Sequence, residues 1–297
     1  MRLVTYKSSA TARASIGVVR DGKDIVELAG GSPAPFDTAD MLSLIASGAA
    51  GLAWVREAAV KSTKSVPLEG AKLLAPIPRP RKNVFCVGWN YVEHFEEGAK
   101  ARPHVQEMPQ HPAFFTKAPT TVNGPFDVVP AHRGVTEKLD WEVELAVIIG
   151  TGGVNIAEAD AMSHIFGYTV ANDVSAREVQ RQHGQQWFKG KSLDGHCPMG
   201  PWIVTADELT DPFNLRITCR VNGATKQDST TSCMYFKIPR IIAELSAGLT
   251  LEPGDIILTG TPAGVGHARN PPEFMKPGDV LETEVAGVGL MRNRIGD

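Results

Sequence analysis

The chain has 297 residues, of which 42% are hydrophobic and 21% are charged, a composition typical of a folded globular protein. Lysine and arginine number 30 and aspartate and glutamate 33, so the net charge of −3 gives no electrostatic reason to expect nucleic acid or an anionic membrane as a partner. No long apolar segment opens the chain, and the four cysteines contain no Cys-x-x-Cys pair. We therefore expect a cytoplasmic protein without a membrane span, disulfides or a zinc site.

Residues 1–75 predict a small leading unit. Strands are expected at Leu3–Tyr6 and Ile16–Val19, and a helix at Asp37–Ala46, where the apolar residues fall on one broad face. The prolines within Pro76–Pro80 fix their own φ angles and restrict the residues before them, which makes a stiff connector. We place a domain boundary there, although the connector also fits a loop within one domain.

Residues 80–297 mix strands with short helices, and they form the second expected domain. The strands outnumber the helices and do not alternate with them regularly, so a doubly wound parallel sheet is not favoured. The expected strands are Val84–Val87, Glu142–Ile149, Ile165–Val170, Asp255–Thr259 and Leu281–Val285, and the expected helices are Ala157–Ile165, Ala176–Arg181 and Pro239–Leu245.

Three carboxylates follow a pattern that suits a metal ion. Glu142 and Glu144 lie two positions apart in a predicted strand, which places them on one face about 7 Å apart, and Asp173 ends another apolar strand. Carboxylates close together repel unless a cation lies between them, and three of them suit Mg²⁺, Mn²⁺ or Ca²⁺. The alternatives are a solvated edge strand for the two glutamates and a helix cap near Ser175 for the aspartate.

A histidine and a glutamate could form an acid–base pair. His94 and Glu97 are three positions apart, so a helix would place them side by side. A carboxylate orients the imidazole and stabilises its charged form, which suits proton transfer near neutral pH. The alternative is a solvated surface turn. The polar segment 98–112 that follows could be a lid or a loop.

Two glycine-containing segments need interpretation. The segment 184–192 does not fit a phosphate-binding P-loop, because five residues instead of four separate its glycines. Lys191 at its end could be partly buried and stabilise an enolate or a carboxylate, or it could be a surface lysine. The segment Gly260–Gly266 could form a backbone nest for an anion, or a tight loop between strands.

Taken together, these segments resemble motifs of the fumarylacetoacetate hydrolase superfamily. Each motif is short, but the ordered set is specific to the family and covers roughly residues 80–297. The first 75 residues resemble only the small N-terminal unit of the family's longer bacterial members. The matching segments are Phe85–Glu97, Pro112–Pro119, Lys138–Val147, Gly167–Arg177, Gly190–Ser192, Cys197–Trp202 and Gly254–Gly266.

The resemblance implies an α+β fold with a mixed β-roll core, a homodimer, and a divalent metal, Mg²⁺ or Mn²⁺, with Ca²⁺ also possible. It implies that the metal chelates the 2-oxo acid end of a small-molecule substrate. The residues that it assigns are His94, Glu97 and Lys191 for catalysis, Gln180, Gly260 and Thr261 for substrate binding, and Glu142, Glu144 and Asp173 for the metal.

The reaction expected first is hydrolysis of a carbon–carbon bond in a 2,4-dioxo acid, of the kind used in aromatic catabolism. His94, assisted by Glu97, would take a proton from water, and the hydroxide would attack the 4-carbonyl. The same site could instead isomerise, decarboxylate or dehydrate a 2-oxo acid, or bind a dicarboxylate without turnover. Trp89 and the segment 230–234 depart from the family pattern and could alter substrate shape or the subunit contact.

Overall fold

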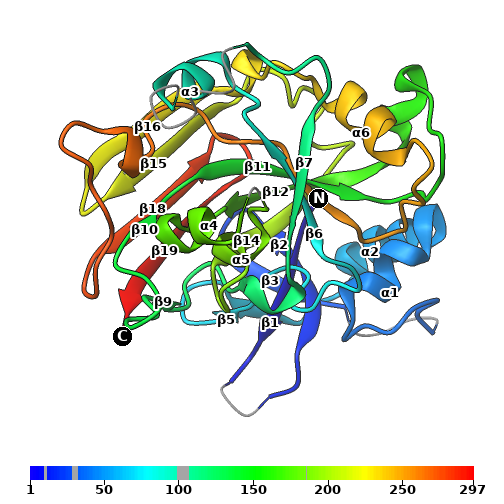
Figure 1. The fold of residues 1–297 in the computed structure, drawn as a ribbon. Coiled ribbons are helices and arrows are strands. Elements are labelled where there is room, and N and C mark those ends of the chain that lie inside the picture. The colour runs from blue at the N-terminus through cyan, green and yellow to red at the C-terminus, as the bar shows by residue number, and fades with distance from the viewer. Residues whose placement is uncertain (10–11, 29–32, 99–106, 185) are drawn as a thin grey trace.

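The structure is a computed structural model that describes the chain except for residues 10–11, 29–32, 99–106 and 185. Strands dominate it, and most of its helices are short (Figure 1). In the described part of the chain, none of the helices has the length and apolarity needed to span a bilayer. The α+β class with a mixed β core, expected from the resemblance, is confirmed.

The largest sheet has twelve strands in the described residues, and β11 (Val143–Ile149) lies in its interior. β11 pairs antiparallel with β12 (Ile165–Asn172) on one side and with β17 (Ile256–Leu258) on the other. β17 lies parallel to β6 (Val84–Gly88), so the sheet is mixed. Its other strands are β1 (Arg2–Lys7), β2 (Ser15–Arg20), β3 (Asp24–Glu27), β4 (Ser65–Pro67), β5 (Lys72–Leu73), β7 (Ala113–Lys117), β8 (Val122–Asn123) and β14 (Cys197–Thr205).

Strand β11 is buried along its whole length, because it lies between two hydrophobic clusters. Val143 and Leu145 belong to one cluster, and Ala146 belongs to the other. Alternation along the strand places the side chain of Glu144 on the same side as Ala146. The interpretation of Glu142 and Glu144 as the solvated face of an edge strand is therefore wrong.

A second sheet of five strands runs in the order β16-β15-β18-β19-β9, and a two-stranded sheet pairs β10 with β13. The β10–β13 pair holds Asp140 opposite Ser175, which brings the chain before Glu142 beside the chain after Asp173. The bounds of these strands are β9 (Val129–Pro130), β10 (Leu139–Asp140), β13 (Ser175–Ala176), β15 (Arg216–Val221), β16 (Ala224–Thr230), β18 (Val280–Val285) and β19 (Gly289–Gly296).

Two of the helices expected from the sequence occur as α4 (Arg177–Gln182) and α6 (Ile238–Ser246). The segment expected to be helical at 157–165 forms a tighter 3-10 helix at Glu158–His164. The other helices of the described chain are α1 (Met41–Ala46), α2 (Gly48–Lys61), α3 (Val92–Glu97) and α5 (Phe188–Lys191).

The leading residues contribute strands to the largest sheet. β1 pairs antiparallel with β14, and Leu3 lies opposite Ile203. The expected helix in this part begins at α1, where the Asp40 carboxylate accepts a hydrogen bond from the Leu42 amide at 3.0 Å and caps the helix. The division into a unit of residues 1–75 and a domain of residues 80–297 stays a prediction.

Candidate active site

Three carboxylates meet where β11 begins and β12 ends. The two strands are antiparallel, and Val143 pairs with Asn172, so the start of β11 lies beside the end of β12. Glu142, Glu144 and Asp173 therefore come together. Each of the three offers a carboxylate oxygen, and these oxygens lie within 4.8 Å of one another. All three side chains are buried. The cluster predicted from the sequence is therefore present as a group of closely placed, desolvated acids.

Three buried cations surround this acidic cluster. Lys191 Nζ donates to Glu142 Oε2 and to Asp173 Oδ2, both at 2.7 Å. Lys117 Nζ donates to Asp173 Oδ1 at 2.6 Å, and Arg177 Nη2 donates to Glu142 Oε1 at 2.6 Å. Lys191 is buried, so the interpretation of this residue as a surface lysine is wrong.

The two glutamates have opposite electrostatic environments. Burial works to raise the pKa of Glu142, but the positive charges of Lys191 and Arg177 outweigh it and hold that pKa below its usual value. Burial, together with the negative charges of Asp173 and Glu142, raises the pKa of Glu144 well above its usual value. Within the part of the chain that the structure describes, no cationic side chain hydrogen-bonds to Glu144, which accepts from the backbone amide of Gly260. Glu144 is thus the carboxylate whose charge is least compensated.

This arrangement fits a divalent cation. The cluster supplies three hard oxygen donors, the type that Mg²⁺ and Mn²⁺ prefer. The uncompensated charge of Glu144 gives a physical reason for a cation to bind beside it. Zinc would fit poorly, because His and Cys side chains are missing from the group of ligating residues found in the described chain.

His94 and Glu97 form the expected pair on helix α3. His94 Nδ1 lies 2.8 Å from Glu97 Oε1, and Glu97 Oε2 accepts from the Gly264 amide at 2.8 Å. His94 is only 9% exposed, which contradicts the alternative of a solvated turn. Its charge is also among those that lower the pKa of Glu142, so the pair lies close to the acidic cluster. With a proton on Nδ1 facing the carboxylate, Nε2 is left to exchange a proton with a ligand.

The three residues expected to bind substrate lie around the same cluster. Gln180 Oε1 accepts from Arg177 Nη1 at 3.2 Å, and the same guanidinium group donates to Glu142. Gly260 donates its amide hydrogen to Glu144 Oε2. Thr261 Oγ1 accepts from Gln227 Nε2 at 2.7 Å. The geometry groups these residues with the predicted metal ligands, while their contacts with substrate stay predictions.

The structure adds buried polar residues that the sequence did not assign. Asp140 accepts from Arg177 Nε at 2.7 Å and from the Gly266 amide at 2.6 Å, so it holds Arg177 against the loop 260–266. Lys117, Asp140 and Arg177 are charged residues within the matching motifs, whereas the polar segment around Gln227 gave no signal. The unassigned residues are Lys117, Asp140, Arg177 and Gln227.

Gln227→Met is expected to lower the free energy of unfolding by at least about 2 kcal/mol, because it leaves buried polar groups without partners. Gln227 Oε1 accepts from the Val143 amide at 3.0 Å, and Nε2 donates to Thr261 and to the Pro262 carbonyl oxygen. Urea unfolding measures the effect. Asp228→Asn on the exposed neighbouring position is the control, expected to change stability by less than about 0.5 kcal/mol. Equal effects of the two substitutions would contradict this role of Gln227.

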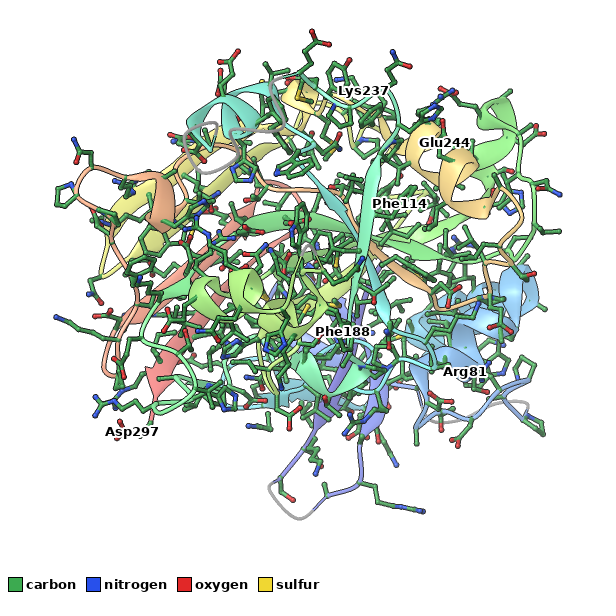
Figure 2. The ribbon with its side chains drawn as sticks, in the orientation of Figure 1. Arg81, Phe114, Phe188, Lys237, Glu244 and Asp297 are labelled. Carbon is green, nitrogen blue, oxygen red and sulfur yellow. The ribbon has the colours of Figure 1, made fainter. Side chains whose placement is uncertain are left out.

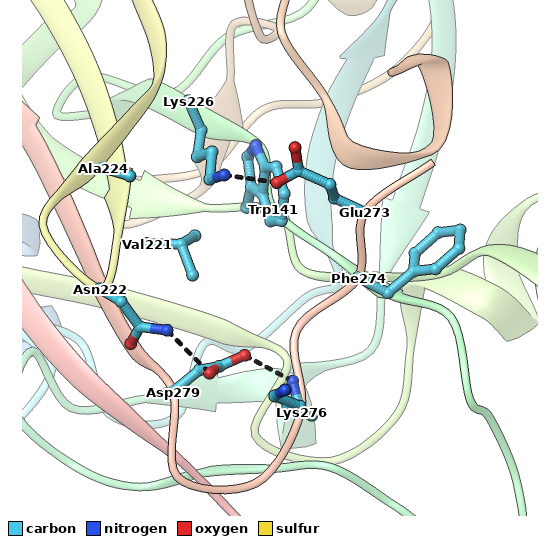
Figure 3. Close-up of a pocket in the computed structure, with 9 residues that line it drawn as sticks. All are labelled: Trp141, Val221, Asn222, Ala224, Lys226, Glu273, Phe274, Lys276 and Asp279. Atoms are coloured by element: carbon cyan, nitrogen blue, oxygen red, sulfur yellow. Dashed lines mark hydrogen bonds and ion pairs between the residues drawn. The ribbon is translucent and has the colours of Figure 1, made fainter. Parts of the chain in front are cut away.

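An open pocket of about 370 Å³ is lined by Trp141 but by none of the three clustered carboxylates (Figure 3). Both acids that line it already have partners: Lys226 binds Glu273, and Asp279 accepts from the Asn222 side-chain amide at 2.9 Å (Figure 3). Trp141 Nε1 donates to the Gly264 carbonyl at 3.1 Å. The indole therefore helps to hold the residue whose amide binds Glu97, and the pocket itself is not the candidate active site.

Buried acids suited to a divalent ion, with a histidine–glutamate pair beside them, are typical of an enzyme that performs metal-assisted acid–base chemistry. The family model described as "Fumarylacetoacetate (FAA) hydrolase C-terminal" matches residues 83–296. The chain belongs to this family, and it is an enzyme of the fumarylacetoacetate hydrolase superfamily.

Individual relatives are similar over nearly the whole chain. "Oxaloacetate tautomerase YisK" of Bacillus subtilis is 41% identical over 96% of this chain and 97% of its own length. "Oxaloacetate tautomerase FAHD2A, mitochondrial" of Homo sapiens is 40% identical over 99% of this chain and 91% of its own. The crystal structure of maleylpyruvate hydrolase from Sphingobium sp. SYK-6, in complex with manganese(II) and pyruvate, is 31% identical with a TM-score of 0.76, covering 100% of this chain and 99% of that one.

These relatives correct the reaction predicted from the sequence. Hydrolysis of a carbon–carbon bond was expected first, but the two relatives that are 40–41% identical over nearly the whole chain are named oxaloacetate tautomerases, an isomerase-type activity. The physical reason for the error is that a His–Glu pair can take a proton from carbon as well as from water. The residues indicate proton transfer beside an anionic intermediate, but they do not specify water as a nucleophile. The isomerase alternative agrees better with the relatives.

Proposed function

We propose that the protein is a divalent-metal-dependent tautomerase that interconverts the keto and enol forms of oxaloacetate or a closely similar 2-oxo dicarboxylate. The observation that carries the proposal is the buried His94–Glu97 pair beside the cluster of Glu142, Glu144 and Asp173. Such a pair can move one proton, and a keto–enol conversion requires the transfer of a proton between carbon and oxygen. The names of the two full-length relatives support the choice of substrate.

In the proposed mechanism, His94 Nε2 removes a proton from C3 of the keto acid. The electrons of the broken C–H bond form the double bond between C2 and C3, and those of the carbonyl move to its oxygen. Lys191, held between two carboxylates, presents an ammonium group that stabilises the negative charge on this oxygen. The oxygen then takes a proton from His94 or from solvent, and the reverse sequence restores the keto form.

Neighbouring residues orient the proposed base and keep the proposed lysine charged, as the proposed reaction requires. Glu97 accepts from the Gly264 amide with its second oxygen, so its orientation toward His94 is fixed from both sides. The negative charges of Asp173 and Glu142 outweigh the effect of burial and raise the pKa of Lys191, which keeps it charged near neutral pH.

We infer that Glu142, Glu144 and Asp173 hold the metal, and Mg²⁺ and Mn²⁺ both suit this donor set. A bound divalent ion would polarise the 2-oxo group and so acidify C3. The manganese and pyruvate in the Sphingobium relative support an ion and a 2-oxo acid as ligands of this fold. A homodimer, a cytoplasmic location, a role in aromatic catabolism and a lid at 98–112 stay predictions. Residues 99–106 of that lid lie outside the described residues.

The protein with Mn²⁺ is expected to accelerate the decay of enol-oxaloacetate, followed by its ultraviolet absorbance, and a chelator is expected to abolish the acceleration. Mn²⁺ without protein is the control, because free divalent ions also act on oxaloacetate. Proton NMR of parallel samples that contain Mg²⁺ in place of Mn²⁺ shows whether any product other than the keto form appears. Absence of acceleration with metal present would contradict the proposal. Stoichiometric pyruvate would instead identify a decarboxylase, the rival reaction at the same site.

A further inference from the structure

Three aromatic side chains form a continuous layer beside the acidic cluster. The rings of Phe115 and Trp187 lie 5.2 Å apart between centroids, and those of Trp187 and Trp89 lie 4.8 Å apart. Trp89 also contacts Phe95 of helix α3 at 6.1 Å, and all of these contacts are edge-to-face. Such contacts interlock the rings, so that one cannot move freely without the others. We call Phe115, Trp187 and Trp89 the aromatic wall.

One end of the aromatic wall, Phe115, lies beside the acidic cluster. Phe115 and Lys117 are two positions apart on β7 and therefore point to the same side of the strand. Lys117 hydrogen-bonds to Asp173, and Lys191 Nζ lies 5.0 Å from the centre of the Phe115 ring. The intervening residue Phe114 is 38% exposed on the outer side of the strand (Figure 2). A ligand that reaches Lys191 is therefore within contact distance of Phe115, the end of the wall nearest this lysine.

The strand below Trp187 leaves room for its ring. Gly88 pairs with Ala113 across β6 and β7, and a Cβ atom at Gly88 would lie 2.4 Å from Trp187 Cζ3. Any larger residue at this position would push the indole off the strand pair. Trp187 also precedes helix α5, which carries Lys191 at its end. The glycine thus allows the indole to pack directly against the strand pair.

Trp89 is held in an unfavourable backbone conformation. Its φ angle is +56°, in the left-handed region that glycine adopts freely and bulky residues avoid. The residue lies between β6 and helix α3, which carries His94. Strained residues of this kind concentrate at functional sites, where the surrounding structure maintains them. The backbone conformation at this position favours glycine. We therefore look to the position of the indole ring, and not to the backbone, for the reason that a tryptophan occurs here.

We propose that the aromatic wall is the specificity-determining surface of the site and restricts its substrates to compact 2-oxo acids of about the size of oxaloacetate. This inference rests on the proposed function. A substrate whose 2-oxo group is next to Lys191 would meet Phe115 first and the two indoles behind it, so a longer chain would have to displace packed rings. Packed rings resist displacement, so added methylene groups meet repulsion.

The test compares oxaloacetate with the six-carbon 2-oxoadipate as substrates for exchange of C3 protons in D₂O, measured by proton NMR with Mg²⁺ present. Trp89→Gly removes the indole and relieves the strained φ angle, so the fold is expected to persist. The ratio of kcat/KM for 2-oxoadipate to that for oxaloacetate is expected to rise at least about tenfold. Trp54→Ala, which removes an indole from helix α2, is the matched control and should leave the ratio unchanged.

An unchanged ratio in folded Trp89→Gly would overturn the proposal. If activity toward both substrates falls by the same factor, the ratio is unchanged and the ring serves only packing. If the wild-type protein leaves oxaloacetate unchanged, the proposed tautomerase function fails by itself. The wall is then tested by binding, from the rise in melting temperature that oxalate or 2-oxoadipate produces in the presence of Mn²⁺. A larger rise in melting temperature with 2-oxoadipate, but not with oxalate, in Trp89→Gly than in the wild-type protein supports the proposal. Equal rises in the two proteins overturn it.

Discussion

His94→Asn is expected to lower kcat for tautomerisation by about 10²- to 10⁴-fold, the usual contribution of a positioned acid–base group. The asparagine side chain can still hydrogen-bond to Glu97, which lies 2.8 Å from His94 Nδ1 in the native protein, but it cannot exchange a proton. Metal binding should persist, because His94 is not one of the clustered carboxylates. The decay of enol-oxaloacetate measures the rate, and the rise in melting temperature with Mn²⁺ measures metal binding.

The chain offers a matched control for this substitution. His111 Nδ1 lies 2.9 Å from Glu244 Oε1, so the two residues form another histidine–glutamate pair, but the His111 side chain is 71% exposed. Figure 2 labels Glu244 on helix α6. His111→Asn should leave both kcat and metal binding unchanged. Near-normal turnover by His94→Asn, or an equal loss in His111→Asn, would exclude the His94–Glu97 pair as the proton-transferring group.

The sequence predicted the central strands and the acidic cluster for the same reason. Continuous apolar runs identify strands buried on both faces, and acids at the ends of such runs are conspicuous. Glu142, Glu144 and Asp173 could therefore be grouped before their distances were known. Their counter-ions could not, because Lys117 is 56 positions from Asp173 and Arg177 is 35 from Glu142. Ion pairs between distant segments depend on the sheet topology, which local patterns do not specify.

Helix α2 was not predicted, for a local reason. It contains Gly48 and Gly51, and glycine weakens a helix by roughly 1 kcal/mol relative to alanine. In the folded chain a Cβ atom at Gly51 would lie 1.7 Å from Ser47 Oγ, so the glycine allows the serine side chain to pack against the helix. A local side-chain contact thus competes with helix propensity at this position. The same competition explains Trp89, where a side-chain requirement overrides the backbone preference.

Glu142→Gln and Glu144→Gln are expected to have opposite effects on the metal-free protein, although both should abolish metal binding. Glu142 pairs with Lys191 and Arg177. When Glu142 is neutralised, each of these two buried cations loses one carboxylate partner. Loss of one member of a buried ion pair costs about 3–5 kcal/mol. Urea unfolding in the presence of a chelator should therefore show a large loss of stability in Glu142→Gln.

Glu144 has the reverse electrostatic situation, because burial and the charges of Asp173 and Glu142 disfavour its ionised form. A glutamine at this position removes the repulsion, and its amide oxygen can still accept from Gly260. Glu144→Gln should therefore unfold at the same urea concentration as the native protein, or a higher one, when metal is chelated. The stabilisation by Mn²⁺ should be lost in both variants, since each removes one of the three donors. Equal destabilisation by the two substitutions without metal would refute the assignment of Glu144 as the uncompensated charge that draws the cation to this site.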